Sequence, residues 1–164
     1  IDTRYFMGIP VEAEIYERGR KHYDQKPIED LYEQFKEAFA SGVKAIRWTQ
    51  YTPYFNDGEP CYFNVHDPFV TLNSVVANHW LEHNTTLEGI EAAEAYPDGD
   101  QDYYDIWDYE YYGYGSHPDG KLPDNAVPDV AAGCYEAALL DAFGDHVVVV
   151  VTPERVVTFE YDHD

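Results

Sequence analysis

The sequence predicts one α+β domain spanning residues 1–164, in which an antiparallel sheet carries two or more helices. Apolar residues recur at helical spacing in residues 27–40. Five consecutive valines at residues 147–151 are typical of a strand that is buried on both faces. Helices combined with hairpins in this way are typical of an α+β fold. A length of 164 residues and a hydrophobic content of 45% fit one domain with a sizeable core.

The first element that the sequence predicts clearly is a helix over residues 27–40. Pro27 suits the first turn of a helix, and Gly42 suits the stop that follows it. The polar residues 11–22 before this helix are ambiguous and fit a strand followed by a turn. The apolar stripe of the predicted helix consists of Ile28, Leu31, Tyr32, Phe35, Ala38 and Phe39.

A hairpin is predicted next, with strands at residues 43–51 and 61–65. Asn56, Asp57 and Gly58 form the turn signal, because these residue types tolerate positive φ. Prolines flank this tip and cannot donate hydrogen bonds to a ladder, so we expect the tip to be wide and irregular. Alternation in the first strand places Ile46, Trp48 and Gln50 on one face and Ala45, Arg47, Thr49 and Tyr51 on the other.

The middle of the chain has weaker patterns. Residues 70–83 are mixed and fit a short helix. Thr85 and Glu88 can form a capping box that opens a further helix ending near residue 96. Residues 98–128 contain no convincing element and are expected to form a long loop region rich in Tyr and Asp.

The C-terminal part has clear elements again. A second helix is predicted over residues 128–143, with Gly144 as its stop. Residues 147–151 and 156–161 flank a polar turn at residues 152–155 and predict a C-terminal hairpin.

Charge is distributed very unevenly along the chain. The formal net charge is −22, from 10 basic and 32 acidic residues. Residues 1–47 are nearly balanced, with eight basic and nine acidic residues, whereas residues 48–120 hold 14 acids and no Lys or Arg. Surfaces normally mix both signs to avoid self-repulsion. The stretch therefore indicates either a uniformly acidic protein of halophilic type or a surface that meets something cationic, and the balance of residues 1–47 favours the second.

The cationic partner could be the basic groove of a nucleic-acid-binding protein, a polyamine-like ligand or a metal ion. Direct binding to nucleic acid is disfavoured, because it requires a stripe of Lys and Arg that neutralises phosphates. No apolar run approaches 18 residues, so no transmembrane helix is expected, and we expect a cytoplasmic protein. Cys61 and Cys134 are expected to be buried thiols in a reducing compartment, although one disulfide is possible.

The region most informative about function is the Tyr/Asp segment, which we define as residues 96–114. It holds seven tyrosines and Trp107, interleaved with six acids. Tyrosine is enriched at interfaces, its ring attracts Arg and Lys, and carboxylates bind the same cations. The segment therefore suits an Arg/Lys-rich partner surface, although it could instead be a loop that packs on its own rings. The predicted partner-binding residues are Asp98, Asp100, Asp102, Tyr103, Tyr104, Asp105, Trp107, Asp108, Tyr109, Glu110, Tyr111 and Tyr112.

Metal and catalytic motifs are incomplete. Asp98, Asp100 and Asp102 match the start of an EF-hand loop, but its Gly and Glu positions are occupied by Tyr103 and Tyr109. His79 and His83 lie four residues apart, as zinc ligands on a helix do, but a third ligand would have to come from elsewhere, such as His66. No nucleophile elbow or phosphate-binding glycine loop is present. We therefore predict no catalytic residues, no metal ligands and no cofactor.

The segment RWTQYTPYFNDGEPCYF resembles one found in small acidic proteins of bacteriophages and their hosts. The resemblance covers roughly residues 43–66. It implies a phage-type origin. Small acidic phage proteins are often inhibitors, and some are DNA mimics whose carboxylates stand in for phosphates.

Taken with the charge pattern, this predicts a non-enzymatic acidic inhibitor that occupies the basic, nucleic-acid-binding site of a host protein. Such a protein would act in counter-defence, for example against restriction, in the host cytoplasm. The first alternative is a metal-dependent or small-ligand enzyme centred on His66, His79 and His83. The second alternative is a virion or scaffold component.

Overall fold

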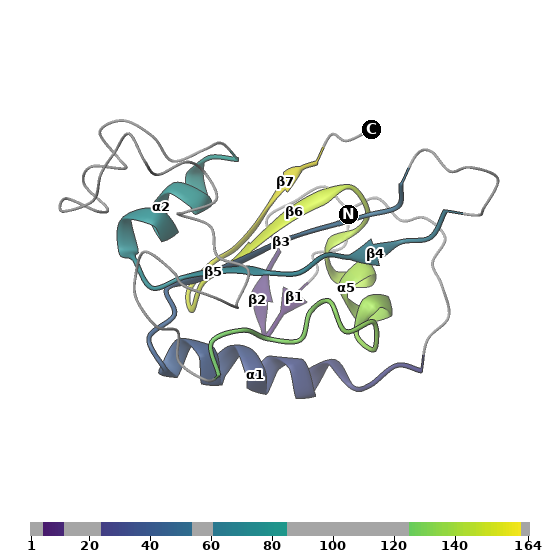
Figure 1. Ribbon diagram of the computed structural model, residues 1–164, viewed down its shortest axis with the longest axis horizontal. Coiled ribbons are helices and arrows are strands. Elements are labelled where there is room, and N and C mark those ends of the chain that lie inside the picture. The colour runs from purple at the N-terminus through teal and green to yellow at the C-terminus, as the bar shows by residue number, and fades with distance from the viewer. Residues whose placement is uncertain (1–4, 12–23, 54–60, 85–124, 162–164) are drawn as a thin grey trace.

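The structure is a computed structural model that describes residues 5–11, 24–53, 61–84 and 125–161 (Figure 1). These residues form three helices, a five-stranded antiparallel sheet and a separate two-stranded hairpin. The predicted α+β class is therefore confirmed. The predicted Tyr/Asp-rich loop lies outside the described residues as far as residue 124.

The five-stranded sheet is built around a long strand, β3. On one edge β3 pairs with β6, which in turn pairs with β7; on the other edge it pairs with both β4 and β5, and all these pairs are antiparallel. Figure 1 shows the helices on both sides of this sheet, with α1 (Ile28–Ala40) and α5 (Glu136–Phe143) below it and α2 (Ser74–Glu82) above. The strands are β3 (Ala45–Tyr51), β4 (Asn64–Val65), β5 (Phe69–Thr71), β6 (Val147–Val151) and β7 (Val156–Glu160).

The strand pattern expected for residues 43–51 is confirmed. Ile46, Trp48 and Gln50 are fully buried on one face of the sheet, which we call the first face. The main core lies on this face, where α1 and α5 pack. Arg47, Thr49 and Tyr51 alternate with these residues and are half-buried on the opposite, second face.

A smaller core lies on the second face. It is formed by Ala45, Val150 and Val157 of the sheet together with Val76 and Trp80 of α2 (Ser74–Glu82). Because β6 contributes to both cores, all five of its valines are buried, as the sequence predicts. The C-terminal hairpin of β6 and β7 is likewise confirmed.

Helix α1 (Ile28–Ala40) confirms the first predicted helix. Leu31, Phe35 and Ala38 recur at helical spacing and are fully buried against the first face. The helix ends as predicted, since Gly42 has φ +116, a conformation that side-chain-bearing residues rarely adopt.

The second predicted helix is much shorter than expected, and the prediction of its start was wrong. The structure has α5 at Glu136–Phe143, and residues 125–135 form turns. Gly133 has φ +90, which a continuous helix does not allow. The start of α5 is capped from far away, because Gln25 Oε1 accepts a hydrogen bond from Ala137 N (3.0 Å) and Gln25 Nε2 donates to the Gly133 carbonyl (3.0 Å). Gly144 (φ +82) ends the helix as predicted.

The returning strand of the first hairpin is also divided. Its register shifts by one residue between β4, where Gln50 lies opposite Val65, and β5, where Ile46 lies opposite Val70. One extra residue between the two short strands makes a bulge, which sequence alternation does not reveal. The predicted turn at residues 56–58 lies outside the described residues.

Two further elements differ from expectation. Residues 70–83, expected as a short helix, begin as β5 and become helical only at Ser74, where the Asn73 side chain caps the helix by accepting from Val75 N (2.9 Å). A hairpin of β1 (Tyr5–Phe6) and β2 (Ile9–Pro10) was not predicted. Its two turn residues, Met7 and Gly8, both have positive φ, and methionine gives little sequence signal for such a turn.

Candidate functional site

All twelve predicted partner-binding residues, from Asp98 to Tyr112, lie outside the described residues, as does the helix predicted after Thr85. The structure describes the residues that flank positions 85–124, namely Asn84 and Asn125. An attachment point to the scaffold near each of these residues, together with the sheet surface beside them, forms the described part of the site.

The first attachment point is held by Arg47, the last basic residue before the cation-free stretch. Its guanidinium lies over the rings of Phe69 (5.9 Å to the centroid) and Trp80 (6.0 Å) on the second face. One of its nitrogens donates to Asn84 Oδ1 at 3.3 Å. These contacts fix the end of α2 against the sheet. From the sequence, Arg47 is recognisable only as the last basic residue before the cation-free stretch. Its structural role could not be predicted, because its contact residues lie more than 20 positions away.

The second attachment point lies on the other side of the sheet. Asp129 N donates to Gln34 Oε1 of α1 at 2.8 Å, and Ala126 and Val130 are fully buried in the main core. Asn84 therefore lies on the second face and residues 126–130 lie beside the first face. Both are held by side chains of the folded scaffold.

The second face also carries a row of three rings. His66 stacks on Tyr51 with ring centroids 4.5 Å apart and an interplanar angle of 20°. The ring centroid of Tyr161, which directly follows β7, lies 5.1 Å from that of Tyr51. All three side chains are half-buried. Burial raises the pKa of Tyr51 above its ordinary value, and the neighbouring Tyr161 raises it further.

A buried carboxylate fixes the end of β3 beside this row. Asp145 is fully buried and accepts hydrogen bonds from Thr52 N (2.7 Å), Thr52 Oγ1 (2.6 Å) and His146 N (2.9 Å). These bonds hold Thr52, which directly follows β3, to the short segment before β6. Asp145 therefore positions backbone, a role that sequence reasoning could not separate from those of 31 other acids.

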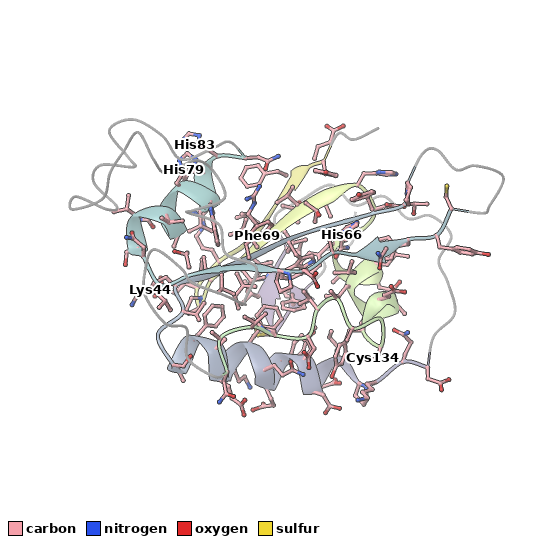
Figure 2. The ribbon with its side chains drawn as sticks, viewed as in Figure 1. Lys44, His66, Phe69, His79, His83 and Cys134 are labelled. Atoms are coloured by element: carbon pink, nitrogen blue, oxygen red, sulfur yellow. The ribbon has the colours of Figure 1, made fainter. Side chains whose placement is uncertain are left out.

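The three histidines of the enzyme alternative do not form one site. His79 and His83 are neighbours on α2, with ring centroids 5.2 Å apart. His66 lies next to β4 and stacks on Tyr51, well away from α2 (Figure 2). Across the described ranges, no three His, Cys, Asp or Glu side chains group closely enough to hold a metal ion.

The two cysteines form no disulfide and are half-buried, whereas fully buried thiols were expected. Within the part of the chain that the structure describes, no helix combines the length and apolar character needed to cross a membrane.

Comparison with known proteins gives no relative from which a function could be transferred. No protein-family model, no curated protein and no solved structure matches this chain.

Proposed function

We propose that this protein is a non-enzymatic acidic inhibitor that occupies the basic, nucleic-acid-binding site of a partner protein. One observation carries the proposal: residues 48–120 contain 14 acids and no Lys or Arg, while the preceding 47 residues are nearly balanced. A stretch of this length accumulates repulsion that a folded protein does not need for solubility. A cationic partner surface would offset that repulsion on binding.

The Tyr/Asp segment is the proposed contact surface. Its carboxylates take the place of phosphates and bind Arg and Lys through charge-assisted hydrogen bonds. Its rings supply rigid contact area and attract the same cations. The proposed phosphate-like groups are Asp98, Asp100, Asp102, Asp105, Asp108 and Glu110, and the proposed anchors are Tyr103, Tyr104, Trp107, Tyr109, Tyr111 and Tyr112.

The way in which the scaffold holds the neighbouring residues supports this role. Arg47 binds Asn84, and Gln34 binds Asp129, so the chain is tied to the fold before and after the Tyr/Asp segment.

The resemblance of residues 43–66 to phage-type acidic proteins leads us to propose a phage origin, action in the host cytoplasm and a role in counter-defence. The expected partner is a basic nuclease, polymerase or defence protein of the host. Inhibition would follow from competition with nucleic acid for one site.

The experiment is affinity capture from a bacterial lysate on the immobilised full chain at low salt, with elution by a salt gradient and competition by duplex DNA. We expect a basic nucleic-acid-binding protein that DNA displaces, and an affinity that falls at least about tenfold as salt rises from roughly 0.05 to 0.3 M, because exposed charges are screened within about 10 Å at 0.1 M.

Two variants of equal charge provide the control. The first converts the six proposed phosphate-like acids to Asn or Gln and should lose capture. The second converts six exposed scaffold acids in the same way and should retain it. An affinity that does not change with salt, or an equal loss of capture in both variants, would contradict the proposal that the protein mimics DNA. The scaffold acids for the control are Asp24, Glu33, Glu37, Asp129, Asp141 and Glu160.

A further inference from the structure

An open cleft lies between α2 and the turn that joins β6 to β7. Its volume is about 480 Å³, within the range of small-molecule sites. Figure 2 shows Lys44 at this end of the sheet, just before β3 begins and below α2. The lining residues that matter here are Lys44, Ser74, Asn78, Leu81, Pro153 and Arg155.

One wall of the cleft is a single face of α2. Ser74, Ala77, Asn78 and Leu81 are spaced three and four residues apart, so they project to the same side of the helix. This wall offers a hydroxyl and an amide next to apolar side chains. It therefore combines hydrogen-bond donors with a surface against which an apolar group can pack.

The opposite wall is a turn with fixed geometry. Thr152 Oγ1 accepts a hydrogen bond from Arg155 N at 2.9 Å, and Thr152 N donates to the Arg155 carbonyl at 2.8 Å. The Arg155 guanidinium also donates to Glu82 Oε1 of α2 at 3.2 Å, which ties the two walls together. The bonds within the turn and between the turn and α2 thus fix the relative position of the two walls.

The charge of the cleft is unusual for this protein. The described residues include five Lys or Arg side chains, and two of them, Lys44 and Arg155, line this cleft. Glu154 is the one acid among the lining residues. In a chain with a net charge of −22, long-range forces repel anions. Lys44 therefore supplies the positive charge that favours a negative group at short range, and Arg155, which is paired with Glu82, lies beside the same site.

We propose that this cleft binds a small organic anion, namely a carboxylate or phosphate group on a short apolar body. Lys44 balances the charge of the anion, the Arg155–Glu82 pair places a guanidinium beside it, and Ser74 and Asn78 supply further hydrogen bonds. Leu81 and Pro153 pack against the apolar body. The site uses none of the residues of the Tyr/Asp segment, so it does not rest on the proposed partner.

The test is a titration of the ¹⁵N-labelled full chain with two probes, inorganic phosphate and hexanoate, at constant ionic strength. We expect saturable shifts confined to the backbone amides of residues 74–82 and 152–155. Saturation by phosphate alone would assign the site to phosphate groups, and tighter binding of hexanoate would assign it to carboxylates with an apolar body. Both outcomes support an anion site.

Variants separate local recognition from the overall charge. Lys44→Ala and Arg155→Ala should each weaken binding about fivefold, the upper range for an exposed charged contact. Lys36→Ala removes an equal charge from α1, where Lys36 pairs with Glu33 at 3.2 Å, and should leave binding unchanged. Leu81→Ala should weaken hexanoate only. Unsaturable or dispersed shifts, or a loss in Lys36→Ala equal to that in Lys44→Ala, would overturn the proposal.

Discussion

Gln50 shows how a polar residue becomes part of the main core. Its amide accepts a hydrogen bond from Trp48 Nε1 (3.0 Å) and donates to the carbonyls of Leu139 (3.0 Å) and Gly144 (2.8 Å). The alternation of residues 43–51 correctly placed Gln50 on the same face as Trp48. It could not reveal why a polar side chain is tolerated there, because the two carbonyls belong to residues 89 and 94 positions away.

Gln50→Leu should destabilise the protein strongly. The leucine would leave the Trp48 indole N–H and two backbone carbonyls buried without these partners, and each such group costs about 1–3 kcal/mol. We expect a loss of roughly 3 kcal/mol in the free energy of unfolding, measured with urea. Gln34→Leu is the matched control, because Gln34 accepts its bond from Asp129 N near the surface, and it should cost less than about 1 kcal/mol. A loss for Gln50→Leu no greater than for the control would contradict this account.

At the scale of elements, the sequence correctly predicted the helices and strands whose boundaries depend on residues close by in the chain. Helix α1 has its own apolar stripe and its own stop, and β6 and β7 have a continuous valine run and a turn, so their sequences suffice. Helix α5 begins eight residues later than predicted, because its cap comes from Gln25, 112 positions away. The bulge between β4 and β5 likewise depends on pairing with β3, which no local pattern records.

The two cores on either side of β6 can be compared directly. Val149 packs in the main core and Val150 in the smaller core beneath α2, and both are fully buried. Val149→Ala and Val150→Ala should each lower the free energy of unfolding by about 2 kcal/mol, because each removes buried methyl groups and leaves a cavity. Thr158 lies opposite Val149 and is half-buried, so Thr158→Ala controls for the change in strand propensity. It should lower the free energy of unfolding less than either valine substitution does. A cost for Val150→Ala below about 0.5 kcal/mol would mean that the second face is not a stabilising core.

At the scale of the whole molecule, residue types alone show where charges and aromatic rings are concentrated in the sequence, but not how they are arranged in space. The charge boundary at Arg47 and the composition of residues 96–114 can be read from residue types alone. The ring row of Tyr51, His66 and Tyr161 could not, because it requires three segments to meet on one face of the sheet. For the same reason the sequence does not predict the cleft beside Lys44 and Arg155, because this cleft requires α2 to lie against the turn after β6.

The net charge of −22 also has a consequence for stability. Repulsion among acids favours the unfolded chain, and salt screens it, with a Debye length that falls from about 30 Å at 0.01 M to about 3 Å at 1 M. The free energy of unfolding in urea should therefore rise by roughly 1–2 kcal/mol between about 0.02 and 0.5 M NaCl. Stability that stays constant or falls with salt would contradict this view.

The same measurement tests whether the acids of the Tyr/Asp segment serve binding or folding. Asp98→Asn, Asp100→Asn and Asp102→Asn together remove three negative charges without changing side-chain size. If these acids serve a partner, the triple variant should be more stable than the unchanged protein at low salt, because repulsion is reduced, and should gain less from added salt. Its capture of the partner should weaken at the same time. A triple variant that is less stable at low salt would show that these carboxylates hold the fold together, and the proposed role of the segment would then be wrong.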